Sequence, residues 1–82
     1  MTDPVRAILG SYAGLSVDAA SVPVDADLFQ AGMTSHATLS VMLALEEQFD
    51  VEFPDEMLRK QTFESVAAIR AAIEELTGVA LS

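Results

Sequence analysis

Ser35 is the residue of this chain whose type and position are best suited to chemistry. Gly32 permits a sharp backbone bend, and the hydroxyl of Thr34 can cap a helix that starts at Ser35 by accepting from a free amide one turn later. We therefore expect Ser35 to lie exposed at a helix N-terminus. The free amides and the helix dipole favour an anion there, so a phosphate esterified to Ser35 would be stabilised.

Other kinds of chemistry fit the sequence poorly. His36 is the only histidine, but adjacent residues at a helix start point in different directions, and no strand-turn-helix elbow presents Ser35 as a nucleophile. Without cysteine there is no cluster with transition-metal spacing. The acidic run from Asp50 to Glu56 lacks the ligand spacing and the glycine of a calcium loop. We expect no catalytic residue and no metal site, and therefore not an enzyme.

Three segments resemble the acyl carrier protein family: Gly32 to Ser35, Leu45-Glu46-Glu47-Gln48-Phe49 and Glu52-Phe53-Pro54-Asp55-Glu56. The resemblance runs without a gap from about Ala26 to Glu56 and more loosely over the rest of the chain. It implies that Ser35 carries a 4′-phosphopantetheine arm, which a phosphopantetheinyl transferase attaches from coenzyme A. The arm would hold an acyl or aminoacyl group as a thioester.

The resemblance also implies a loading ligase and a downstream acceptor or transferase enzyme. The site reads Thr34-Ser35-His36 where the family usually has Asp-Ser-Leu, and Ala37 and Ser40 replace its usual acidic residues. This site is similar to small stand-alone carriers that ligases charge with amino acids, so an aminoacyl cargo is favoured over a fatty-acid or polyketide chain. The alternative function is a carrier-shaped protein-interaction module that has lost the modification.

The candidate partner contacts lie around Ser35 and along the helix that follows it. They are Thr34, His36, Leu39, Leu43, Glu46 and Glu47. Leu43 falls off the centre of the apolar stripe, where either a partner or a neighbouring loop could cover it. The two glutamates are expected on the outer side of the helix.

Charge and composition limit the classes of partner. The net charge is -9, and no Lys or Arg falls between Ala7 and Leu58. Such an acidic span repels nucleic acid and anionic membranes and would steer the chain toward basic proteins, although it can also be a solvated face. With no secretion signal and no apolar segment long enough to cross a bilayer, we expect a cytoplasmic monomer without nucleic-acid or membrane partners.

Apolar residues at helical spacing predict three longer helices and one short one. The first starts at Asp3-Pro4 and ends near Gly14, the second runs from about Ser35 to Phe49, a short third runs from Pro54 to about Arg59, and the last runs from about Ser65 to Leu76. The expected core positions of the three longer helices are Val5, Ile8, Leu9 and Tyr12; Leu39, Val41, Met42, Leu45 and Phe49; and Val66, Ile69, Ile73 and Leu76.

The connecting segments complete the prediction. Residues 15 to 24 have no sustained period, so we expect a surface loop with Leu15, Val17 and Val22 against the core, then a helical turn at Asp25 to Phe29. The tail from Val79 to Ser82 is expected to fray. Hydrophobic residues make up 51% of the 82 residues, enough for one core. The sequence therefore predicts an all-α four-helix bundle in one domain, residues 1–82.

Overall fold

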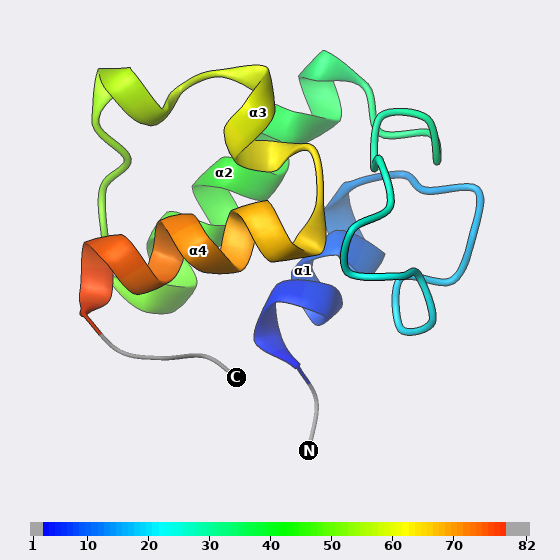
Figure 1. Ribbon diagram of the computed structural model, residues 1–82, viewed down its shortest axis with the longest axis horizontal. Helices are drawn as coiled ribbons and strands as arrows, with labels where there is room; N and C mark the ends of the chain where they lie inside the picture. Colours follow the sequence, from blue (N-terminus) through cyan, green and yellow to red (C-terminus); the bar gives the residue numbers. More distant parts are fainter. Residues whose placement is uncertain (1–2, 79–82) are drawn as a thin grey trace.

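The computed structural model describes residues 3–78, and the regular secondary structure in this part of the chain is all helical. Its elements are α1 (Pro4–Tyr12), α2 (Ser35–Phe49), a 3-10 turn (Asp55–Met57), α3 (Lys60–Phe63) and α4 (Val66–Thr77). In Figure 1, α4 crosses in front of α2, α1 lies below, and α3 closes the upper side. The predicted bundle of three longer helices and one short helix is confirmed.

The first helix begins where its cap predicts. The Asp3 carboxylate accepts from the backbone N–H of Val5 at 3.0 Å and from that of Arg6 at 3.5 Å. Val5, Ile8 and Leu9 are buried as expected, but Tyr12 is 51% exposed, so its prediction as a core residue is wrong. Ala13 takes the buried position instead, one turn after Leu9.

Arg6 pins the long connection that follows α1. Its guanidinium donates to the carbonyl oxygens of Ala19 at 2.9 Å and Val22 at 2.7 Å. Val22 is therefore buried as predicted and Leu15 is partly buried, whereas Val17 is 51% exposed, contrary to expectation.

The connection ends in a hydrogen-bonded turn that starts at Asp27, two residues later than predicted. The Asp27 carboxylate accepts from the backbone N–H of Phe29 at 2.9 Å, and its carbonyl accepts from Ala31 at 3.1 Å. Leu28 is fully buried and Phe29 is half-buried, so both anchor the chain before α2 as expected.

Helix α2 has the predicted bounds but a narrower buried stripe. Val41 and Leu45 are fully buried, and Met42 and Phe49 pack partly buried against the core. Leu39 is 51% exposed, so the expectation that it broadens the core stripe is wrong. With about 100° of rotation per residue, Leu39 lies about 160° around the helix from Val41 and faces away from the core.

The predicted third helix from Pro54 to Arg59 is wrong. The chain forms a single 3-10 turn at Asp55–Met57, and Arg59 is extended and precedes α3. The stabilising contact is distant in sequence: Phe53 packs on Phe63 with ring centroids 5.3 Å apart, and both are buried. A helix of four residues is too short for its apolar residues to repeat at helical spacing, so the sequence pattern could not predict α3.

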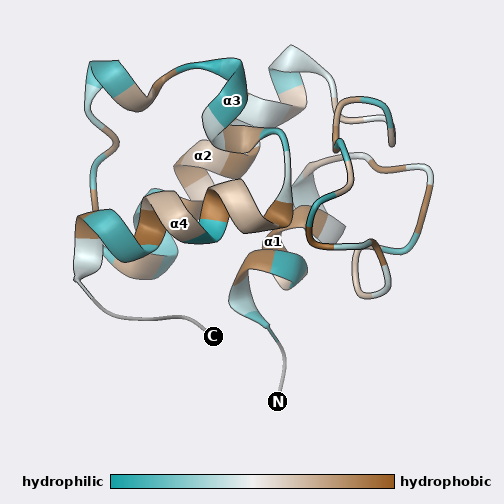
Figure 2. Ribbon diagram, viewed as in Figure 1, coloured by the Kyte–Doolittle hydropathy of each residue, from teal (hydrophilic) through white to brown (hydrophobic). Residues whose placement is uncertain are grey.

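Helix α4 follows its predicted pattern. The Ser65 hydroxyl accepts from the backbone N–H of Ala68 at 3.0 Å, and Gly78 ends the helix with a φ of 72°. Its predicted apolar residues are buried except Leu76, which is partly buried. Figure 2 shows the brown residues of α4 in alternation with polar ones and teal along the 3-10 turn and α3. The tail from Val79 to Ser82, which was predicted to fray, lies outside the described residues.

None of the helices in the described part is both long enough and apolar enough to cross a membrane.

Candidate functional site

The turn before Ser35 depends on a glycine. Gly32 has a φ of 121°, and a Cβ there would lie 3.2 Å from the carbonyl oxygen of Gly14 and 3.2 Å from the nitrogen of Ser16. A side chain would meet both a disfavoured backbone angle and tight contacts with fixed backbone. The close approach of two segments therefore shapes the entry to α2.

Ser35 occupies the position that the sequence predicts. Thr34 is extended, and its Oγ1 accepts from the backbone N–H of Ala37 at 3.0 Å, so α2 starts at Ser35. The Ser35 side chain is exposed, as are those of Thr34 and His36. No hydrogen bond between Ser35 and His36 occurs in the part of the chain that the structure describes. The site therefore presents an exposed hydroxyl to which no side-chain base of residues 3–78 is hydrogen-bonded.

Backbone hydrogen bonds hold the segment that leads into α2, residues 28–33, between the start of the long connection and the junction of α3 and α4. The Met33 N–H donates to the Leu28 carbonyl at 3.0 Å, and the Leu28 N–H donates to the Glu64 carbonyl at 2.7 Å, which joins the segment to the junction of α3 and α4. On the other side, the Ser16 N–H donates to the Ala31 carbonyl at 2.8 Å. The serine is thus displayed on a positioned segment.

A groove of about 460 Å³ lies beside Ser35, between α2 and the segment that leads into α3. Its lining residues are Phe29, Ser35, Thr38, Leu39, Met42, Leu58, Arg59, Lys60 and Phe63. Most of this lining is apolar. The exposed hydroxyl of Ser35 at its edge fits a phosphodiester-linked arm, because the arm would have both free space and an apolar surface next to its attachment point.

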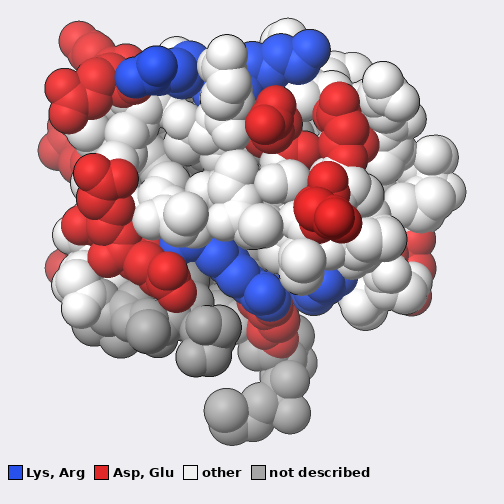
Figure 3. All heavy atoms as spheres, in the orientation of Figure 1, with Lys and Arg blue, Asp and Glu red and all other residues white. Residues whose placement is uncertain are grey.

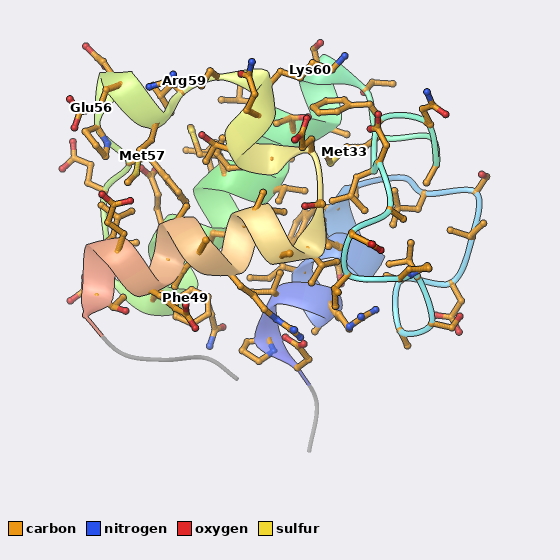
Figure 4. The ribbon with its side chains drawn as sticks, viewed as in Figure 1. Met33, Phe49, Glu56, Met57, Arg59 and Lys60 are labelled. Carbon is orange, nitrogen blue, oxygen red and sulfur yellow. The ribbon has the colours of Figure 1, made fainter. Side chains whose placement is uncertain are left out.

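Two basic residues of this groove, Arg59 and Lys60, were not predicted as site residues from the sequence. Arg59 Nε donates to the Glu56 carbonyl at 2.7 Å, and Lys60 Nζ lies 5.2 Å from the centre of the Phe29 ring. Both are labelled along the upper edge of the molecule in Figure 4, and Figure 3 shows basic atoms along the same edge. One feature of the sequence could have indicated them, because they are the first basic residues after Arg6.

The predicted partner contacts differ in how available they are. Leu39 is 51% exposed and Leu43 is 55% exposed, so no loop covers Leu43. Glu47 is also exposed. The expectation that both glutamates lie on the outer side of the helix is wrong for Glu46, which is half-buried and accepts from the Phe53 N–H at 2.9 Å.

Within residues 3–78, no group of three or more His, Asp or Glu side chains is placed to hold a metal ion.

Comparison with known proteins gives one family match and similar carrier proteins. Residues 3–73 match the protein family described as the phosphopantetheine attachment site. The aminoacyl carrier protein of Agrobacterium fabrum (strain C58) is 36% identical over 74 residues, which cover 90% of this chain and 89% of that protein. The acyl carrier protein of Akkermansia muciniphila is 36% identical over 77 residues, which cover 93% and 91% of the two chains.

The fold is also similar to a solved complex. It contains an engineered Bradyrhizobium japonicum glycine:carrier protein ligase, a carrier protein from Agrobacterium tumefaciens and AMP. The match has a TM-score of 0.85 and 36% identity, and it covers 90% of this chain and 99% of the matched chain. Because the family match spans most of the sequence, including the turn that displays Ser35, this chain belongs to the acyl carrier protein family, whose members carry phosphopantetheine.

Proposed function

We propose that Ser35 is the attachment residue for 4′-phosphopantetheine and that this chain carries an aminoacyl group on that arm. One observation carries the proposal: Ser35 is exposed as the first residue of α2, within residues 3–73, which match the phosphopantetheine attachment family. The bound arm supplies a thiol that forms the thioester. The chain itself supplies the position of the hydroxyl and the surface that partners recognise.

Other serines are less suitable for attachment. Ser16 donates its hydroxyl to the Ala31 carbonyl at 2.9 Å, Ser65 caps α4, and Ser40 is half-buried within α2. Ser11 is exposed on α1 but lines neither the groove nor a helix start. Ser35 alone among these five has an exposed position at the beginning of a long helix.

In the attachment reaction this chain would contribute only the Ser35 hydroxyl. The Ser35 hydroxyl oxygen would form a bond to phosphorus, its proton would leave, and the nucleotide part of coenzyme A would be released. Since no base hydrogen-bonds to Ser35 within residues 3–78, a phosphopantetheinyl transferase would supply the base. The Thr34 cap keeps the hydroxyl in the first turn of α2, where such an enzyme can reach it.

An amino acid is the cargo that the comparisons favour. This chain is 36% identical both to an aminoacyl carrier protein and to the chain matched in the glycine:carrier protein ligase complex. We infer that a ligase of this type loads the arm and that a downstream transferase accepts the aminoacyl group. In this role the chain is a cytoplasmic carrier on which enzymes act, and not itself an enzyme.

Intact mass measurement tests the attachment site. The unmodified protein is incubated with coenzyme A and a phosphopantetheinyl transferase, beside Ser35→Ala and the matched control Ser11→Ala. The wild type and Ser11→Ala should gain one phosphopantetheine, and Ser35→Ala should gain none. Modification of Ser35→Ala would place the arm elsewhere, and an unmodified wild type would support a module that has lost the arm.

A loading assay then tests the cargo. The modified protein is offered to a glycine:carrier protein ligase with glycine and ATP, and separately to an acyl ligase with a fatty acid and ATP. Faster thioester formation with glycine is expected. Preferential loading with the fatty acid would instead identify an acyl carrier.

A further inference from the structure

The basic residues of this chain are divided between two very different surroundings. The sequence has four Lys and Arg residues against a net charge of -9. Arg6 and Arg70 both form ion pairs with Asp3. Arg59 and Lys60 form no ion pair with any carboxylate of residues 3–78, although acidic side chains are abundant. The two cations without an ion pair both line the groove beside Ser35.

Contacts other than ion pairs hold these two cations in place. The guanidinium of Arg59 is held by the Glu56 carbonyl at 2.7 Å, and the Lys60 ammonium lies over the face of the Phe29 ring. Neither contact neutralises the positive charge. The groove therefore carries two positioned positive charges at its rim.

The same groove lacks acidic residues. None of its lining side chains is Asp or Glu. Two other cavities contain carboxylates beside their basic residue: one is lined by Glu56 and Glu75 together with Arg59, which borders both that cavity and the groove, and another by Asp3 and Asp18 together with Arg6. An anion at the Ser35 groove would thus meet two positive charges and no carboxylate of the groove lining, in a protein whose net charge is -9.

We propose that Arg59 and Lys60 bind the phosphodiester of the arm on Ser35, so that the arm lies along the groove rather than extending freely into solvent. This inference rests on the proposed modification of Ser35. The phosphate is covalently tethered to a residue of the same groove, so its effective concentration near the two cations is high. The apolar lining, with Leu39 and Leu58 at its surface, then adjoins the uncharged part of the arm.

A carboxylate from a partner enzyme is the other anion that could occupy this place. The tethered phosphate is favoured because it is present in every modified molecule, whereas a partner must first bind. Each exposed cation raises the equilibrium constant for the arm lying in the groove about two- to fivefold. Two cations together can therefore favour the arm in the groove without holding it there permanently. Partners could still withdraw the arm.

Phosphorus-31 NMR of the modified protein tests the proposal, because the arm contributes the only phosphorus. The charge-removing variant Arg59→Gln/Lys60→Gln is compared with the charge-retaining control Arg59→Lys/Lys60→Arg, at low and high salt. In the wild type and the control, the resonance should move with salt toward the position it has in the Gln variant. In the Gln variant it should be insensitive to salt.

A second measurement needs no variant. Backbone amide spectra of the wild type before and after modification should show shifts at residues 59 and 60 as well as near residue 35. Shifts confined to the surroundings of Ser35, together with the same phosphorus resonance and salt response in all three proteins, would overturn the proposal. If only loading by the ligase fell in the Gln variant, the two cations would bind a partner carboxylate and the proposal would also fail.

Intact mass separates this inference from the proposed function. A wild-type protein that gains no arm on Ser35 would refute the proposed function and this inference together. A protein that is modified on Ser35, but whose arm ignores Arg59 and Lys60, would refute only the inference.

Discussion

The carboxylate of Glu46 accepts a hydrogen bond from the backbone N–H of Phe53 at 2.9 Å. Between them, Asp50 adopts the left-handed conformation with a φ of 53° and ends α2, so the chain turns back alongside the helix. Phe53 in turn packs against Phe63 at the end of α3. The hydrogen bond between Glu46 and Phe53 thus connects α2 to the buried aromatic pair. Through Phe63, which lines the groove, it also connects α2 to one wall of the groove.

Glu46→Ala should therefore lower the free energy of unfolding by about 1–2 kcal/mol, because it leaves the Phe53 amide without its charged acceptor. Glu47→Ala is the matched control on the exposed side of the same helix and should change stability by less than about 0.5 kcal/mol. Urea unfolding followed by circular dichroism measures both. Equal effects of the two variants would show that the hydrogen bond contributes no stability.

Leu45→Ala should destabilise the protein by about 2–5 kcal/mol, because Leu45 is fully buried and its truncation opens a cavity. Leu43→Ala removes the same atoms from a side chain that is 55% exposed and should cost less than about 1 kcal/mol. Thermal unfolding of the two variants provides the comparison. A near-native melting temperature for Leu45→Ala would contradict the register of α2.

Gly32→Ala should cost about 2–3 kcal/mol, because alanine at a φ of 121° is strained and its Cβ meets the backbone of Gly14 and Ser16. Gly14→Ala is the control: its φ is 68°, but no atom lies within 4 Å of the added Cβ, so about 1–2 kcal/mol is expected. Unfolding titrations distinguish them. A Gly32 variant more stable than the Gly14 variant would mean that the close approach of the two segments relaxes easily.

Partner recognition along α2 should depend more on apolar contact than on charge. Leu43→Ala should reduce the rate of arm loading by the ligase about fivefold or more, while Glu47→Gln should reduce it less. Raising the salt concentration should shrink the Glu47 effect by screening and leave the Leu43 effect in place. Loading rates of both variants at low and high salt test this. A larger loss for Glu47→Gln at both salt concentrations would refute the apolar contact.

The three longer helices could be predicted from the sequence because their signals are local. Asp3, Thr34 and Ser65 each cap a helix by bonding an amide two or three residues away. Such bonds close within one turn and need no partner from elsewhere in the chain. For the same reason, the position of Ser35 at the start of α2 was predictable, whereas the family was indicated separately by the resemblance of three sequence segments to acyl carrier proteins.

Which side of each helix is covered could not be predicted with the same success. Tyr12 and Leu39 fit an apolar stripe by spacing, yet each is 51% exposed. Helical period gives the relative directions of side chains, but burial depends on which neighbouring segment packs against them. Val17 shows the same limit, because it is 51% exposed although Leu15 and Val22 of the same loop are partly or fully buried.

The surroundings of Ser35 were decided by the tertiary structure. Phe29 comes from the long connection, Leu39 from α2, and Leu58 and Lys60 from the segment around the start of α3. These residues become neighbours because Phe53 and Phe63 bury each other and bring that segment back toward α2. The sequence by itself determined where the hydroxyl stands, through a cap that closes within one turn. Only long-range packing decided that a groove with two unpaired positive charges lies beside it.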